Sequence, residues 1–199
     1  MYPNRLAGAS MWYPEWDTEA FFQMAERFQI PAKRKFHRFS QGERKKTALV
    51  IAFTSQAPFL LLDEPTNGLD INSRHYFHQL IKTYMETGER TVWMATHAVD
   101  DIRKLADYIY RLQNGQIQGP YEKDELTNNW CKYWIPQDQH IPEQVPGELS
   151  RTAGPMQELL SCQADQTEHF LRAQGISIFD QQTLSLEFVL DYMIRFHMD

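Results

Sequence analysis

The chain has 199 residues, of which 42% are hydrophobic and 23% are charged, the balance of an ordinary soluble globular protein. This length suffices for one domain with an appendage, or for two small domains. No apolar run approaches the roughly 20 residues that a membrane-spanning helix needs, and the first residues lack the pattern of a signal peptide.

The net charge of −6 is unevenly distributed. Residues 1–127 hold 16 basic and 16 acidic residues, whereas residues 128–199 hold 4 basic and 10 acidic ones. The acidic segment argues against nucleic acid as a partner. The change in character predicts two domains, 1–127 and 128–199. Cys131 and Cys162 form no C-x-x-C pair, so we expect two free thiols.

Helices and strands alternate through the first part of the chain, which predicts an α/β fold with a mostly parallel sheet and flanking helices. The apolar periodicity and the capping residues give their order. We expect a helix capped by Asp17 and ended by Pro31, a helix capped by Ser40 and running to about Thr54, a buried strand over 58–63, an amphipathic helix over 72–88, a second buried strand over 90–97, a short helix over 98–106, and two strands joined by an Asn-Gly turn over 108–119.

The last part of the chain predicts a small C-terminal α+β extension. The stretch 141–155 is rich in proline and glycine and is typical of a loop or linker. Two further helices are expected over 167–175 and 184–197. The sequence shows no internal repeat.

Polar residues follow both predicted buried strands, Asp63 and Glu64 after the first and Thr96 and His97 after the second. Ligands of open parallel sheets bind at the carboxyl ends of the strands. Asp63 could hold Mg²⁺, which favours carboxylate and water oxygens, and Glu64 could act as a base toward a water. His97 could bond a phosphate oxygen. Taken singly, each residue has a simpler explanation as a helix cap or part of a solvated loop.

Ser40 and Gly42 stand at the start of a predicted helix, within the stretch "FSQGERKK". The free N–H groups and the dipole of a helix N-terminus attract anions, so this end could hold a phosphate. Glycine lets the backbone approach such a group closely. Basic residues cluster around this helix start; a solvated surface is the alternative explanation for that cluster.

Together these segments resemble the second half of an ATP-binding-cassette (ABC) ATPase domain, over about residues 15–125. "FSQGE" resembles the family signature, usually written LSGGQ, and "FLLLDE" resembles the Walker B strand with its catalytic glutamate. "NGLD" resembles the D-loop, and "ATH" resembles the switch-histidine loop. The four motifs occur in the family's order.

The resemblance implies a role for each matching residue. Glu64 would polarise the attacking water, His97 would contact the γ-phosphate, and Asp63 would hold Mg²⁺ through water. The γ-phosphate would lie against the signature residues, and Asp70 would lie at the interface between two cassettes. The implied cofactors are ATP and Mg²⁺, and the implied partners are a second ABC ATPase subunit and transmembrane permease subunits. The signature residues are Ser40, Gln41, Gly42 and Glu43.

The chain departs from the family pattern in two ways. Gln41 replaces a glycine of the signature and Glu43 replaces a glutamine; the carboxylate would repel a phosphate unless the basic residues at 44–46 offset it. The phosphate-binding pattern G-x-x-x-x-G-K-[ST] is absent from the 199 residues. The resemblance therefore implies a partial P-loop NTPase domain, a C-terminal portion with exposed sheet edges, and we expect no ATP hydrolysis by the chain alone.

Three functions are compatible with these motifs. The first is the ATP-hydrolysing subunit of an ABC membrane transporter, cytoplasmic and peripheral on the inner face of the cell membrane. The second is a non-hydrolysing interaction module that lends its signature face to a full-length cassette. The third, a soluble ABC protein acting on ribosomes or DNA, is disfavoured by the single partial cassette and the acidic C-terminal segment.

Overall fold

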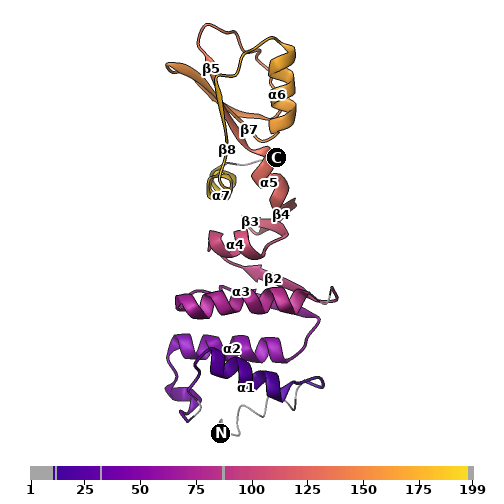
Figure 1. The fold of residues 1–199 in the computed structure, drawn as a ribbon, viewed down its shortest axis with the longest axis vertical. Helices are drawn as coiled ribbons and strands as arrows, with labels where there is room; N and C mark the ends of the chain where they lie inside the picture. The colour runs from indigo at the N-terminus through magenta and orange to yellow at the C-terminus, as the bar shows by residue number, and fades with distance from the viewer. Residues whose placement is uncertain (1–10, 12, 32, 87, 197–199) are drawn as a thin grey trace. The chain divides into compact units, whose positions relative to one another are not determined.

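The computed structural model describes residues 11, 13–31, 33–86 and 88–196. By their internal contacts the residues group into two compact units, 1–105 and 106–199, whose elements are shown in Figure 1. Residues 106–127, which composition assigns to the first domain, group with the second unit. The domain boundaries themselves stay a prediction.

The first unit contains the helices and strands that carry the four motifs. Two of its helices begin at the predicted capping residues, Asp17 and Ser40, whose side chains accept hydrogen bonds from the backbone of the first turn. The described elements are α1 (Thr18–Arg27), the 3₁₀ turn η2 (Phe36–Arg38), α2 (Gln41–Thr54), β1 (Phe59–Asp63), α3 (Ile71–Met85), β2 (Thr91–Ala95) and α4 (Val99–Leu105).

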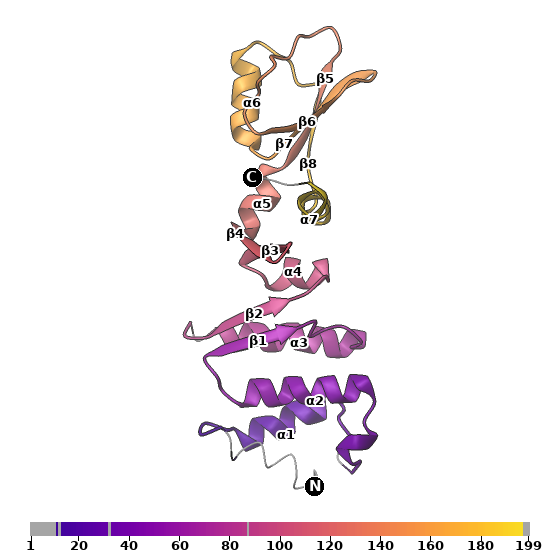
Figure 2. The same ribbon diagram turned by 180° about the vertical axis from the view of Figure 1, so that it is seen from behind.

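The strands β1 and β2 are parallel neighbours joined by α3, with Asp63 opposite Ala95 at their carboxyl ends. Figure 2 shows them side by side over α3. This β–α–β unit confirms the α/β class, but the described sheets are small and mixed, so they do not show the predicted mostly parallel sheet. The later strand pairs are antiparallel, and two of them, β3 with β4 and β6 with β7, are joined by turns too short for a parallel crossover. Among the described residues, these two strands pair with each other alone.

The prediction that both strands are buried is also wrong, since only one face of the sheet is covered. Leu60 and Leu62 point into the core, whereas Leu61 is 71% exposed. Phe59 and Trp93 lie on the same exposed face as Leu61. The continuous apolar run in the sequence concealed this alternation, because both faces carry hydrophobic side chains.

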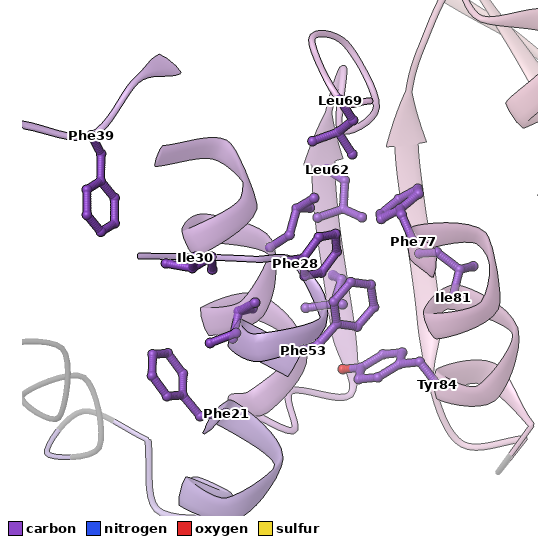
Figure 3. Packing of buried hydrophobic residues seen from close by; sticks show 14 residues of the cluster. Phe21, Phe28, Ile30, Phe39, Phe53, Leu62, Leu69, Phe77, Ile81 and Tyr84 are labelled. Atoms are coloured by element: carbon purple, nitrogen blue, oxygen red, sulfur yellow. The ribbon is translucent and has the colours of Figure 1, made fainter. Parts of the chain in front are cut away.

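The core of the first unit is an aromatic cluster between the helices and the covered sheet face (Figure 3). The rings of Phe53 and Tyr84 meet edge to face at 5.5 Å between centroids, and Phe77 packs against Phe53 at 6.1 Å. Such edge-to-face pairs add to the gain from burying apolar surface. The apolar stripes of α1 and α3 face this core, with Phe21, Ala25, Phe28, Phe77, Ile81 and Tyr84 buried and Met24 and Leu80 half-buried.

The second unit begins with the predicted antiparallel pair, β3 (Tyr108–Gln113) and β4 (Gln116–Glu122). Asn114 and Gly115 both have positive φ, 51° and 78°. Positive φ at both central positions is the geometry that an Asn-Gly hairpin turn requires, so this prediction is confirmed. A short helix, α5 (Lys123–Asn129), follows.

The rest of the second unit is a four-stranded antiparallel sheet with helices, in agreement with a small α+β extension. Its helix α6 packs against the buried side chains of β5 and β7. The predicted loop over 141–155 is wrong in part, because β6 lies within it. The elements are β5 (Cys131–Pro136), β6 (Glu148–Thr152), β7 (Met156–Ser161), α6 (Ala164–Ala173), β8 (Asp180–Thr183) and α7 (Leu186–Arg195), with strand order β6-β7-β5-β8.

The predictions about the cysteines and about membrane-spanning helices can be compared with the described residues. Cys131 and Cys162 are free thiols, as predicted. Burial raises the pKa of both thiols, which keeps them protonated and unreactive near neutral pH. Within the described part of the chain, none of the helices combines the length and the apolar character needed to cross a membrane.

Candidate nucleotide site

The carboxyl ends of β1 and β2 bring the predicted catalytic residues together. The parallel register places Asp63 beside Ala95, and the N–H of Glu64 donates to the Ala95 carbonyl at 2.8 Å. The backbone turns away from the sheet after each strand, so Glu64 and His97 follow adjacent strands and lie at the same edge of the sheet.

Glu64 and His97 are bonded to each other twice. The Nδ1 atom of His97 lies 2.7 Å from Glu64 Oε1, and the His97 backbone N–H donates to the same oxygen at 3.1 Å. Glu64 has a φ of +44°, a left-handed conformation that non-glycine residues seldom adopt. Its side chain is 31% exposed and that of His97 is 78% exposed. A carboxylate held by an imidazole and open to solvent can serve as a base toward a water.

Asp63 lies at the end of β1 with an exposed carboxylate that makes no hydrogen bond or ion pair with the described residues. Mg²⁺ commonly takes one or two protein carboxylates, several waters and phosphate oxygens. The chemistry of this free carboxylate fits such an ion. One group of described residues, His78, Asp100 and Asp101, has the spacing of a metal cluster, and Asp63 is not a member of it.

The start of α2 has the geometry predicted for "FSQGE". The Ser40 hydroxyl accepts from the Glu43 N–H at 3.2 Å, and a Glu43 carboxylate oxygen accepts from the Ser40 N–H at 2.7 Å. This reciprocal capping box leaves the N–H groups of Gln41 and Gly42 without acceptors among the described residues. Free donors and the dipole of a helix start attract anions in general, and the binding of a phosphate at this end stays a prediction.

The Glu43 carboxylate reaches back to the start of α2, where its charge is paired. Its carboxylate forms an ion pair with Arg34, with oxygens 2.9 and 3.1 Å from the guanidinium Nη1. The backbone N–H of Ser40, and then the charge of Arg34, hold the pKa of Glu43 below its ordinary value. The Glu43 carboxylate is thus paired with Arg34, nine residues upstream, and its predicted effect on a phosphate stays a prediction.

Lys45, which the sequence offered only as a positive charge beside Glu43, makes two contacts with the turn after β1. Its Nζ donates to the carbonyls of Glu64, at 2.6 Å, and Asn67, at 3.0 Å. Lys45 of α2, the helix that begins with the signature residues, therefore holds the turn that begins at Glu64. Gly42 also lies beside this turn, since a Cβ added to it would sit 3.4 Å from the Gly68 carbonyl. That spacing is ordinary contact, so the internal packing of the chain does not require glycine at position 42.

Asp70 caps α3 and binds the signature helix. Its side chain accepts from the Ser73 N–H at 2.9 Å and pairs with Lys46 Nζ at 2.7 Å. The Lys46 hydrogen bond, with those of Ser73, holds the pKa of Asp70 far below its ordinary value. The carboxylate is still 56% exposed, so a role at an interface between two cassettes stays a prediction.

A separate hollow of about 270 Å³ lies in the second unit between the sheet and α7. Its lining charges pair with each other, Lys132 with Glu158 at 3.2 Å and Arg195 with Asp191 at 2.9 Å. None of the predicted site residues lines it. The predicted chemistry is therefore confined to the first unit.

Comparison with known proteins agrees with this geometry. A sequence profile described as "ABC transporter" matches residues 7–67. The chain is 25% identical over 181 residues to the ABC transporter ATP-binding protein YtrB of Bacillus subtilis (strain 168), covering 88% of this chain and 61% of YtrB. The chain is thus similar to ABC transporter ATP-binding proteins over much of its length. This confirms the resemblance inferred from the four motifs.

Other proteins match shorter parts of the chain. The thiamine import ATP-binding protein ThiQ of Rhizobium meliloti (strain 1021) is 41% identical over 87 residues, covering 44% of this chain and 37% of ThiQ. A solved structure of the ATP-binding subunit of an ABC transporter superposes with a TM-score of 0.54 at 21% identity, covering 62% of this chain and 53% of that one. The chain thus spans between about a third and two thirds of the length of these three proteins.

Proposed function

We propose that this chain is the ATP-binding and ATP-hydrolysing subunit of an ABC membrane transporter, acting at the inner face of the cell membrane with permease subunits. The observation that carries the proposal is the contact between Glu64 and His97 at the ends of adjacent parallel strands. The similarity to ABC transporter ATP-binding proteins and the capped start of α2 support it.

The residues of this chain supply only part of a nucleotide site. Asp63 would hold Mg²⁺, which would neutralise charge on the phosphates. Glu64 would accept a proton from the attacking water, with its carboxylate oriented by His97. The 199 residues contain no G-x-x-x-x-G-K-[ST] pattern to hold the β- and γ-phosphates, so we propose that groups outside them complete the site.

In the proposed assembly the free N–H groups of Gln41 and Gly42 face a phosphate bound by a second ATPase subunit. The arrangement stabilises negative charge through preorganised donors, which contribute most where water is excluded. Asp70 would lie close to the same interface, next to Lys46 of the signature helix.

The test is the Glu64→Gln variant, assayed for ATP turnover after mixing with a complete ABC ATPase subunit of the same transporter. Loss of the base should lower kcat by about 10²–10⁴-fold while ATP binding persists. Glu86→Gln makes the same carboxylate-to-amide change at an exposed position at the end of α3 and should leave turnover unchanged. Unchanged turnover in Glu64→Gln would remove Glu64 from the role of base.

A second function is favoured by one specific observation. The anion-binding end of α2 is complete, whereas the phosphate-binding pattern is absent from the 199 residues. The chain would then be a non-hydrolysing module that supplies only its signature face to a full-length cassette. In that case Glu64→Gln in this chain would not change the turnover of the mixture.

A further inference from the structure

The loops that follow β1 and β2 are tied together at two places. The first tie is the contact between Glu64 and His97. The second joins the loop after β1 to the first turn of α4, which follows β2: the Thr66 hydroxyl donates to the Asp101 carboxylate. Thr66 lies two residues after Glu64, and Asp101 lies four residues after His97.

The two ties differ in burial. Thr66 is 1% exposed and Asp101 is 0% exposed, whereas the side chains of Glu64 and His97 are open to solvent. Exposed ion pairs contribute little to holding a geometry because water competes for both partners. A buried carboxylate, by contrast, is strongly disfavoured unless its bonds are made. The buried tie therefore sets the relative position of the loops, and the exposed one follows it.

Asp101 is itself fixed to the core by a third residue. Its other carboxylate oxygen lies 2.7 Å from His78 Nε2, and His78 belongs to α3 and is 5% exposed. His78 is the neighbour of Phe77, which is fully buried in the aromatic cluster. Both oxygens of Asp101 are thus occupied, one by α3 and one by the turn after Glu64.

We infer that Thr66 and Asp101 are positioning residues that hold Glu64 in contact with His97. The inference rests on the proposed function, in which this pair acts on water. His78, Asp100 and Asp101 have the spacing of a metal cluster, but a metal is not needed to explain them. Asp100 pairs with Lys104 at 2.7 Å, and each carboxylate oxygen of Asp101 has a hydrogen-bond partner.

The test reads the ring nitrogens of His97 by ¹⁵N NMR in the purified full chain. Thr66→Val keeps the shape of the side chain but removes its hydroxyl, and Thr66→Ser keeps the hydroxyl. The His97 signals should move in Thr66→Val to their position in Glu64→Ala, where the contact is lost. They should stay at the wild-type position in Thr66→Ser. Wild-type His97 signals in folded Thr66→Val would overturn the inference.

A reverse experiment keeps the inference testable if Thr66→Val does not fold. His97→Ala removes only an exposed side chain, so the chain should fold normally. Because the buried tie does not depend on the exposed one, the ring signals of His78 should be unchanged in this variant. A displaced His78 signal would overturn the inference. Neither experiment measures ATP turnover. A result that contradicts this inference can therefore be told apart from a result of the Glu64→Gln assay that contradicts the proposed function.

Discussion

At the scale of single residues, Asp70 shows how one carboxylate serves two elements. It caps α3 through the Ser73 N–H and pairs with Lys46 of α2. Because the pKa of Asp70 is lowered from 3.8, the folded chain binds this proton less readily than the unfolded chain. The pairing therefore stabilises the fold above about pH 4 and is lost progressively as the pH falls further.

This sign gives a prediction for Asp70→Asn. The asparagine can still accept from the Ser73 N–H but cannot pair with Lys46. Between neutral pH and a pH of about 3, the unfolding temperature of wild type should fall more than that of Asp70→Asn, because only in wild type does the unfolded chain take up a proton at this position that the folded chain resists. Thermal unfolding followed by circular dichroism measures the difference. Parallel pH profiles for the two proteins would show that the pairing does not contribute.

The sequence predicted the candidate site residues better than it predicted their contacts. Glu64 and His97 could be placed together because parallel strands present their carboxyl ends at one edge. The Arg34 partner of Glu43 and the two carbonyls that Lys45 binds could not be predicted, since long basic side chains reach many acceptors and their choice depends on tertiary structure. Thr66 and Asp101 gave no signal, because an aspartate in the first turn of a helix is usually explained by the helix dipole.

At the scale of elements, β1 has one covered and one open face. Leu60 is 6% exposed and its neighbour Leu61 is 71% exposed. Leu60→Ala should cost about 2–5 kcal/mol in the free energy of unfolding, since it leaves a cavity in the core. Leu61→Ala should cost less than about 0.5 kcal/mol, as is usual for surface substitutions. Chemical denaturation of both variants tests this, and equal losses at the two positions would mean that both faces are buried.

The helices were easier to predict than the strands, for physical reasons. Asp17 and Ser40 are side chains that satisfy the free N–H groups of a first turn, so they mark helix starts directly. β5 could have been found, because the buried residues Cys131, Tyr133 and Ile135 alternate with half-buried ones. β8 could not, since all four of its residues are exposed and carry no apolar pattern; pairing with β5 alone defines it.

At the scale of the whole molecule, the chain combines a unit that carries the ABC motifs with an α+β unit that carries none of the predicted site residues. In the first unit, two lysines connect α2 to the rest of the candidate site. Lys45 bonds the turn that begins at Glu64, and Lys46 bonds Asp70. Through these contacts, a phosphate bound at the start of α2 would be linked to the candidate base of the same chain.

The most direct test of the account is whether the start of α2 contacts a nucleotide. Ser40→Ala and Asp17→Ala each remove a helix cap from the first unit, at a similar cost of about 1 kcal/mol, but only Ser40 belongs to the proposed phosphate site. ATP turnover is measured with each variant mixed with a complete ABC ATPase subunit of the same transporter. We expect Ser40→Ala to lower turnover about tenfold or more, as loss of an anion-stabilising group does, and Asp17→Ala to leave it unchanged. Equal turnover for the two variants would contradict the account.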